Sequence, residues 1–265
     1  MTENRHFVTY QNYLKVPELL SLQSPLSDPA EHDETLFIVI HQVYELWFKV
    51  VLHELDRVCA LLAAGDGARA AATMKRVLTV LKVLVAQLDI LETMTPVEFE
   101  SFRDRLESAS GFQSAQFREV EFALGLKRAG VAGRFPEGSE ERTRLEWRLA
   151  RPTLWDAFLQ FLAGRGCAIP AGALARDVTE LIAPDEDVQD ALVGIYRTDP
   201  ELANLCERLV DLDEGVQEWR YRHVKMVERT IGSKRGTGGS MGVAYLASTV
   251  GAHAFPDLWA IRARL

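Results

Sequence analysis

The chain has 265 residues, of which 48% are hydrophobic and 26% are charged, a composition that suits a folded globular protein and excludes disordered and collagen-like classes. Its 38 acidic and 30 basic residues leave a net charge of −8, which disfavours nucleic acid as a partner. Three well-separated cysteines indicate a reducing compartment. The charged N-terminus and the short apolar runs predict neither secretion nor membrane insertion. We therefore expect a cytoplasmic protein.

The periodicity of the apolar residues predicts an all-α fold, because spacings of three and four residues recur in nearly every long segment. A first long helix is expected to begin near Asp33, which would cap it. A second is expected to run from about Met74 to Leu91 and to end before Pro96. The apolar face of the first helix contains Phe37, Ile40, His41, Tyr44, Trp47 or Phe48, Val51 and Leu55.

A third long helix, beginning at Pro200, has the most regular pattern in the chain. Alternating steps of three and four residues are typical of the seam of a helical bundle. The residues on this seam are Leu202, Leu205, Leu209, Leu212, Val216, Trp219, His223, Met226 and Thr230. Because no glycine- or proline-rich stretch is long enough to act as an interdomain linker, residues 1–265 are predicted to form one domain.

Two of the histidines, His41 and His223, lie on the apolar faces of long helices. Either one alone is most simply a hydrogen-bonded core histidine, since a buried imidazole needs a partner to offset its desolvation. Together they indicate a ligand site between facing helices, where a haem iron needs only one histidine. Zinc and di-iron sites are disfavoured, because the chain has no His-Glu-x-x-His motif and its one Glu-x-x-His motif is Glu3 to His6.

The segment 232–242 combines glycine residues with basic residues directly after the third long helix. Such a segment lets backbone amides approach an anion closely, but it lacks the Gly-Lys-Ser/Thr pattern of a phosphate-binding loop. Composition alone favours a flexible surface loop, and a site for haem propionates or a carboxylate substrate is the alternative.

Several longer blocks along the chain form a recognisable set. They are residues 10–14 (YQNYL), 32–49 (HDETLFIVIHQVYELWFK), 102–114 (FRDRLESASGFQS) and 220–240 (RYRHVKMVERTIGSKRGTGGS). In these blocks, and in their order, the chain resembles the tryptophan 2,3-dioxygenases over nearly its whole length.

The resemblance implies an all-helical enzyme that uses haem b and O2 and adds both oxygen atoms across the indole C2–C3 bond of L-tryptophan, giving N-formyl-L-kynurenine. His223 matches the axial ligand of the haem iron. His41 matches the distal histidine, which hydrogen-bonds the indole N–H and positions the substrate for catalysis. Phe37 matches a residue that packs on the indole ring, and Arg103 matches the one that pairs with the substrate carboxylate.

Further matched positions complete the implied site. Thr237 matches a threonine that contacts the ammonium or carboxylate end of the substrate. Phe99 and Leu106 match residues lining the substrate pocket, and Ser110 and Gly111 match residues near the haem edge. Without the resemblance, these positions would be read as ordinary core or turn residues.

The resemblance also implies a homo-oligomer, typically a homotetramer. Tyr10, Tyr13 and Leu14 match an N-terminal segment that, in this family, reaches into the active site of a neighbouring subunit. We therefore expect residues 1–30 to contribute to the site of another copy of the chain. The residues by themselves show only an aromatic pair three positions apart.

Leu88 and Met241 depart from the family's pattern, since an aromatic residue and a serine are expected there. Both departures concern the substrate, because an enlarged pocket admits a substituted tryptophan. One alternative is therefore a haem oxygenase of the same fold that acts on another aromatic amino acid or inserts a single oxygen atom. The other is a non-catalytic haem or gas-binding helical protein, which needs His223 but neither Arg103 nor Thr237.

Overall fold

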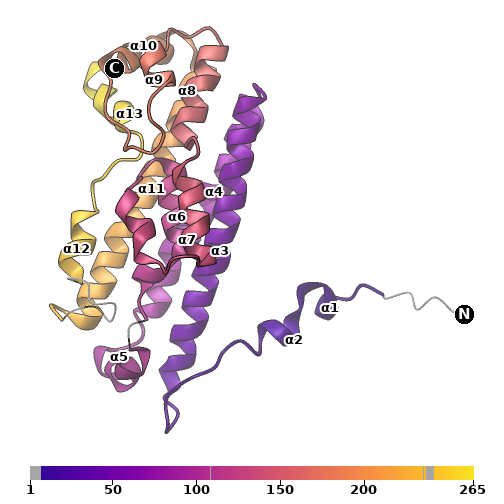
Figure 1. Cartoon of the computed structure of the whole chain (residues 1–265), viewed down its shortest axis with the longest axis vertical. Helices are drawn as coiled ribbons and strands as arrows, with labels where there is room; N and C mark the ends of the chain where they lie inside the picture. The colour runs from indigo at the N-terminus through magenta and orange to yellow at the C-terminus, as the bar shows by residue number, and fades with distance from the viewer. Residues whose placement is uncertain (1–6, 108, 235, 237–241) are drawn as a thin grey trace, which may run out of the picture.

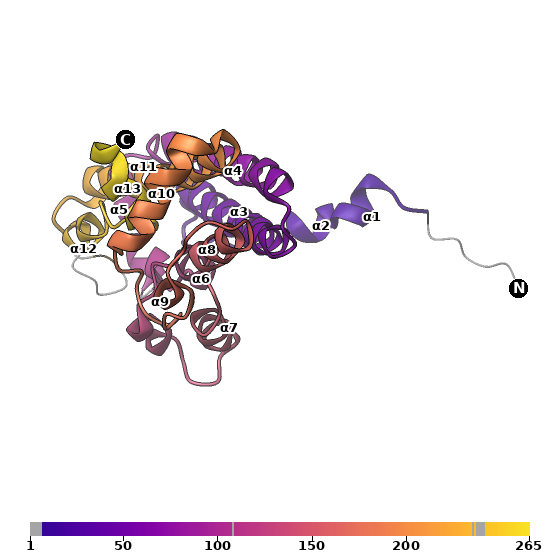
Figure 2. The same cartoon turned by 90° about the horizontal axis from the view of Figure 1, so that it is seen from above.

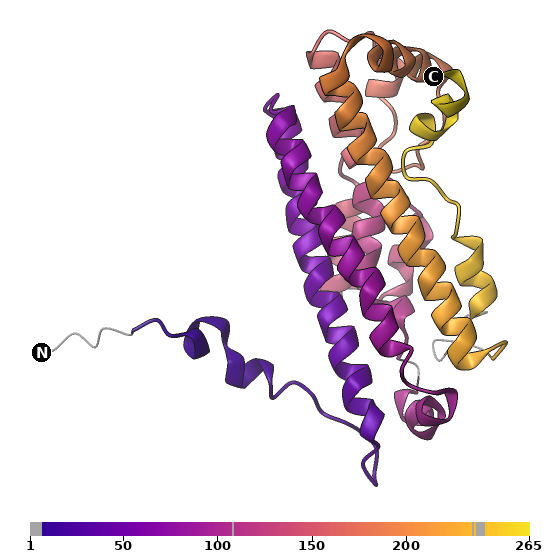
Figure 3. The ribbon, with the colours of Figure 1, turned by 180° about the vertical axis from the view of Figure 1, so that it is seen from behind.

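The fold is built around long helices that run alongside one another (Figures 1 and 3). The computed structural model describes residues 7–107, 109–234, 236 and 242–265, and these residues form helices and connecting segments without a β-strand, which confirms the all-α prediction. The long helices are α3 (His32–Ala63), α4 (Gly67–Leu91) and α11 (Pro200–Ile231). Because α4 packs against both α3 and α11, it is the middle member of this group.

The remaining helices are shorter. They are α1 (Tyr10–Leu14), α2 (Val16–Leu19), α5 (Pro96–Arg103), α6 (Ala115–Leu124), α7 (Glu140–Leu149), α8 (Leu154–Gly164), α9 (Ala171–Leu174), α10 (Glu186–Thr198), α12 (Val243–Ser248) and α13 (Pro256–Ala260). Short 3-10 turns lie at Asp104–Leu106, Gly111–Gln113, Ala129–Arg134 and Ile261–Arg264. Helices α6 and α8 pack on α3, and α12 packs on α11.

The ends of the long helices follow from local chemistry. The Asp199 side chain accepts hydrogen bonds from the first backbone amides of α11, and Pro200, which has no amide hydrogen to satisfy, occupies the first helical position. The prediction that Asp33 caps the first helix is wrong, because α3 begins one residue earlier with Glu31 at the cap position. Asp33 lies in the first turn instead, where its negative charge favours the positive end of the helix dipole.

The apolar stripes predicted from the sequence meet in one core. Buried side chains on α3, α4, α8, α10, α11 and α13 form a single cluster. Phe48 is buried and Trp47 is only partly buried, which decides between the two expected core positions. On α11, all seam residues except His223 and Thr230 are buried. These two polar residues therefore lie where the packed apolar core ends.

Helix α3 is apolar enough that length and composition alone would let it cross a membrane, with a mean hydropathy of 1.4 over its most apolar window. In the fold it packs against α4, α5, α6 and α8, and this position in the bundle also requires an apolar helix. The absence of a membrane span therefore stays a prediction.

Residues 7–30 form an arm that leaves the bundle (Figures 1 and 2). Glu34 fixes the base of the arm, because its buried carboxylate accepts hydrogen bonds from the backbone N–H groups of Leu26 at 2.6 Å and Ser27 at 3.0 Å. Towards its tip the arm exposes aromatic side chains, with Tyr10 72% and Tyr13 74% exposed. Large exposed apolar side chains in a row indicate a surface that another molecule covers.

A buried carboxylate holds the C-terminal segment on α11. Asp213 is fully buried, and its Oδ2 accepts hydrogen bonds from the backbone N–H groups of Ala254 and Phe255 and from Nε1 of Trp259. Replacing Asp213 with alanine leaves these donors without an acceptor, so we expect the free energy of unfolding to fall by about 2–4 kcal/mol. Urea denaturation measures this change.

Asp211 provides the matched control, since it is on the same helix, is 42% exposed and pairs with Arg208. Its replacement by alanine should cost less than about 1 kcal/mol. Equal losses for the two variants would show that the hydrogen bonds of Asp213 contribute nothing specific to docking of the C-terminal segment.

Candidate functional site

A cavity of about 240 Å³ lies between α3, α4, α5, α6, α11 and α12, and most of its lining is apolar. Most of the predicted site residues line it: Phe37, His41, Phe99, Arg103, Leu106, Ser110, Gly111 and His223. Leu88, the departure noted on α4, also lines the cavity. Tyr10, Tyr13 and Leu14 lie on the exposed arm, and Thr237 and Met241 lie outside the described residues.

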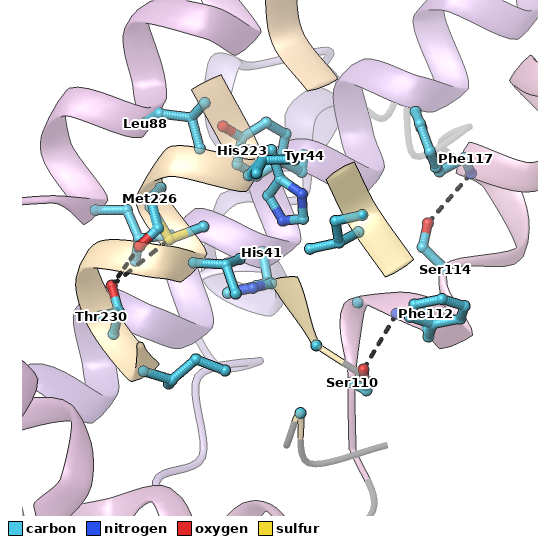
Figure 4. A pocket seen from close by; sticks show the side chains of 18 of the residues that line it. His41, Tyr44, Leu88, Ser110, Phe112, Ser114, Phe117, His223, Met226 and Thr230 are labelled. Carbon is cyan, nitrogen blue, oxygen red and sulfur yellow. Dashed lines mark hydrogen bonds between the residues drawn. The ribbon is translucent and has the colours of Figure 1, made fainter. Parts of the chain in front are cut away.

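His41 faces the cavity from α3 (Figure 4). Its Nδ1 lies 2.7 Å from the carbonyl oxygen of Phe37, one helical turn earlier. Because a carbonyl oxygen only accepts hydrogen bonds, Nδ1 carries the proton and Nε2 keeps its lone pair as an acceptor. Burial lowers the pKa of the His41 imidazole below its usual value, although the Phe37 carbonyl and the Glu45 carboxylate act in the opposite direction. The ring is therefore neutral at pH 7.

His223 faces the same space from α11 (Figure 4). Its ring stacks on Trp219 with the ring centroids 5.1 Å apart and the planes 4° from parallel. Burial lowers the pKa of the His223 imidazole to about 4, with smaller contributions from the nearby His41 and Arg118. Neither ring nitrogen hydrogen-bonds to any residue that the structure describes. A neutral, enclosed imidazole without a protein partner is what an axial ligand of iron requires.

The donor set of the cavity fits haem better than a metal ion held by the protein alone. Within residues 7–107, 109–234, 236 and 242–265, no group of three or more His, Cys, Asp or Glu side chains converges to hold a metal ion. A single histidine suffices when a porphyrin supplies the other four ligands of the iron. The mostly apolar lining also suits a flat, largely apolar macrocycle. The chemistry of His223 and its surroundings therefore fits haem.

Aromatic side chains from α3 and α5 form one side of the cavity. The centroid of the Phe37 ring lies 5.8 Å from that of Phe99, 5.6 Å from that of Phe102 and 4.1 Å from that of the His41 ring. Aromatic rings at these separations favour offset or edge-to-face contacts with a further ring. Phe37 and Phe99 therefore form a wall suited to a planar aromatic ligand beside the acceptor nitrogen of His41.

Arg103, at the C-terminal end of α5, contributes a positive charge to the cavity lining. Its side chain is 16% exposed and pairs with Glu100 at 3.5 Å, and Lys234 pairs with the same carboxylate at 3.0 Å. From the sequence alone Arg103 would be a solvated charge. The structure instead places it in the cavity wall, where a guanidinium is well shaped to bind a carboxylate.

Ser110 and Gly111 lie in the turn that leads into α6. The Ser110 hydroxyl oxygen accepts a hydrogen bond from the backbone N–H of Phe112, and that of Ser114 accepts one from Phe117 (Figure 4). These caps fix the turn, so that Phe112 and Phe117 both line the cavity. Ser110 thus shapes the wall through the backbone that it holds.

Other cavity residues were missed by the sequence analysis. Tyr44 donates a hydrogen bond to the Leu84 carbonyl, and Trp219 supports His223; both had been taken only as core residues. Arg118 and Glu121 on α6 were not singled out at all. Periodicity marks Tyr44 and Trp219 as facing inwards, but no sequence signal separates the lining of a cavity from the core around it.

An all-helical fold whose cavity is lined by two neutral histidines, with an aromatic wall beside His41, is the arrangement expected of a protein that holds haem and a planar aromatic ligand. The family model described as "Tryptophan 2,3-dioxygenase" matches residues 2–136 and 180–265. The chain therefore belongs to the tryptophan 2,3-dioxygenase family, which confirms the resemblance.

Relatives named tryptophan 2,3-dioxygenase match nearly the whole chain. The protein from Herpetosiphon aurantiacus is 59% identical over 97% of this chain and 98% of its own length. Those from Anaeromyxobacter sp. strain K and Caulobacter vibrioides are 55% and 46% identical, again over 97% of this chain, and the matches cover 96% and 98% of their lengths.

Proposed function

We propose that the chain is a haem-dependent dioxygenase that adds O2 across the indole C2–C3 bond of L-tryptophan to give N-formyl-L-kynurenine. The observation that carries the proposal is a single cavity that collects His41, His223, Phe37 and Arg103. Relatives of up to 59% identity with the name tryptophan 2,3-dioxygenase support it.

His223 would hold the haem iron through the lone pair of its neutral imidazole, and Ser110 and Gly111 would lie near the edge of the macrocycle. Haem, when bound, supplies the iron that activates O2. The stacked Trp219 ring fixes the orientation of the His223 imidazole, so that little rotational freedom is lost on ligation.

The cavity residues would position tryptophan. His41 Nε2 accepts the hydrogen bond of the indole N–H, and Phe37, Phe99 and Leu106 exclude water and pack on the ring. Arg103 binds the substrate carboxylate, and Thr237, outside the described residues, would contact the same end of the substrate. Holding the indole and the carboxylate at opposite ends fixes the C2–C3 bond in one place, which lowers the entropic part of the barrier.

The protonation state of His41 predicts the pH dependence of the reaction. Burial lowers the pKa of this imidazole, and only the neutral ring accepts the indole hydrogen bond. We therefore expect kcat/KM for tryptophan to stay level between about pH 8 and 6.5 and to fall at lower pH, by up to about tenfold per pH unit. Steady-state rates from pH 5 to 8 test this.

The His41→Ala variant should lose this acidic limb, while His53→Ala, which removes an exposed histidine of the same helix, should keep it. A limb centred well above pH 6.5, or one that persists without His41, would assign the titration to another group.

The proposed reaction is tested by anaerobic reduction of the haem-loaded chain, followed by air and L-tryptophan. Growth of the N-formylkynurenine absorbance with a product carrying two additional oxygen atoms supports it. A product with one additional oxygen indicates the single-oxygen alternative. A haem spectrum without turnover on tryptophan or substituted indoles indicates a non-catalytic haem protein.

The exposed arm supports a homo-oligomer, with a homotetramer as the proposed state. Tyr10 and Tyr13 are mostly exposed, and Leu14 is 45% exposed, so a neighbouring copy would cover them and receive them at its site. Light scattering of the intact chain tests this, and a monomer at micromolar concentration would contradict it. The free state of Cys59, Cys167 and Cys206 supports a cytoplasmic location.

A further inference from the structure

A buried carboxylate in the cavity lining gathers arginines from three parts of the chain. Glu121 on α6 is 2% exposed. It pairs with Arg118 Nη1 at 2.6 Å on the same helix, with Arg128 Nη2 at 2.9 Å after α6, and with Arg220 Nη2 at 2.7 Å on α11. Burial raises the pKa of the Glu121 carboxyl, but the arginine charges outweigh this effect and hold it below its usual value. Glu121 is therefore ionised.

The cluster carries more positive than negative charge. Each arginine pairs with the same carboxylate, and no second acidic group in the described part of the chain lies within ion-pair distance of any of them. The side chains of Arg118 and Arg220 are only 8% and 5% exposed. Arg128 is 34% exposed, so the buried part of the cluster, two arginines against one carboxylate, keeps a net positive charge that a further anion would stabilise.

Two of these arginines face the cavity in fixed positions. Arg118 and Arg220 both line it, together with Glu121. The Arg118 guanidinium lies over the rings of Phe112 and Phe117, at 5.4 Å and 4.9 Å from their centroids. Arg220 donates further hydrogen bonds to backbone carbonyls of Thr249 and Ala252 beyond α12. These contacts fix both guanidinium groups before a ligand binds, which favours carboxylate binding.

This cluster is distinct from the cationic position at Arg103. Arg103 shares Glu100 with Lys234 at the end of α5, whereas the cluster belongs to α6 and α11. Arg220 precedes His223 by three residues on α11, about one helical turn. The cavity therefore offers one cationic group beside the aromatic wall and another beside His223.

We propose that Glu121 is a positioning residue, which holds Arg118 and Arg220 as a preformed carboxylate-binding pair, and that this pair receives a carboxylate of the haem. The inference rests on the proposed function, because that function supplies the haem. The substrate carboxylate is the other source of the same chemistry, and the experiment separates the two.

The test compares the binding of haem with that of haem dimethyl ester, whose carboxylates are blocked, by following the Soret absorbance of the intact apoprotein. We expect the wild-type chain to prefer haem by about tenfold or more, the effect of a charge-assisted hydrogen bond. The Arg118→Gln variant should bind the two porphyrins equally. The Glu121→Gln variant should also lose the preference, although both arginines remain, and Glu121→Asp should recover part of it.

Arg148 provides the matched control, because it is equally buried, pairs with Asp56 and lies outside the cavity lining. Arg148→Gln should keep the wild-type preference. Binding of the dimethyl ester by each variant shows that its cavity is intact, so a loss of fold is not mistaken for a loss of carboxylate binding.

Distinct outcomes would overturn the inference. Equal binding of the two porphyrins by the wild-type chain, or an unchanged preference in Arg118→Gln, would show that this arginine pair does not bind a haem carboxylate. Tighter haem binding by Glu121→Gln would show that Glu121 competes with the ligand instead of positioning the arginines. An Arg118→Gln variant that weakens tryptophan but not tryptamine binding would assign the pair to the substrate. Failure of the wild-type chain to bind either porphyrin would instead contradict the proposed function.

Discussion

Replacing His223 with alanine is expected to lower the affinity for haem by at least about 100-fold, because the loss of a direct ligand exceeds the 10- to 100-fold effects of residues behind one. Turnover on tryptophan should be lost with the haem. The helical content should stay unchanged, since the imidazole faces a cavity and makes no hydrogen bond to the part of the chain that the structure describes. Haem titration followed by Soret absorbance, with circular dichroism of the apoprotein, measures both effects.

Two controls separate ligation from packing. His53→Ala removes an exposed histidine from α3 and should bind haem like the wild-type chain. Free imidazole added to His223→Ala should occupy the space left by the side chain and restore part of the haem spectrum. A variant that binds haem with wild-type affinity and an unchanged spectrum would show that another residue holds the iron.

The long helices and the two central histidines were predictable from periodicity alone. Helices α3, α4 and α11 lie where apolar spacing placed them, because each helix must bury a continuous stripe. His41 and His223 interrupt those stripes, and a polar residue in an apolar stripe has to be paired or ligated. Their position on a cavity was therefore foreseeable, whereas their assignment to haem and tryptophan came from the family resemblance.

The charged part of the cavity was not predictable in the same way. The pairing of Glu121 with Arg220 joins residues 99 positions apart, and sequence periodicity carries no information about such pairs. Arg103 and Arg118 also look like solvated helix charges until the fold buries them. Local patterns report which face of a helix is apolar, but the placement of a charge beside a cavity depends on how the helices pack.

The arm illustrates a second limit. Tyr10 and Tyr13 stand on a short helix whose capping box at Thr9 is local, so the helix itself follows from adjacent residues. Their exposure has no explanation within one chain, and the proposed neighbouring subunit would supply what covers them. For such a segment, the resemblance to a family supplies the expectation and only an experiment on the assembly tests it.

Replacing Arg103 with leucine should raise the KM for L-tryptophan by about 100-fold, which corresponds to the loss of two charge-assisted hydrogen bonds to the substrate carboxylate. The effect should be specific to that carboxylate. Tryptamine, which lacks it, should bind the variant and the wild-type chain equally, as measured by the change that each ligand causes in the haem spectrum. Glu100 is 47% exposed and keeps Lys234 as a partner, so the substitution does not leave this carboxylate unpaired.

Arg222 supplies the matched control, because it lies one residue before His223 but pairs with Asp89 and does not line the cavity. Arg222→Leu should leave the KM for tryptophan unchanged. An unaltered KM in Arg103→Leu would show that the carboxylate binds elsewhere, and the arginine pair held by Glu121 would then be the remaining cationic position in the cavity lining among the described residues. An equal loss of affinity for tryptamine and tryptophan would instead show that Arg103 shapes the cavity and does not bind the carboxylate. The two ligands thus distinguish recognition of charge from maintenance of shape at the same residue.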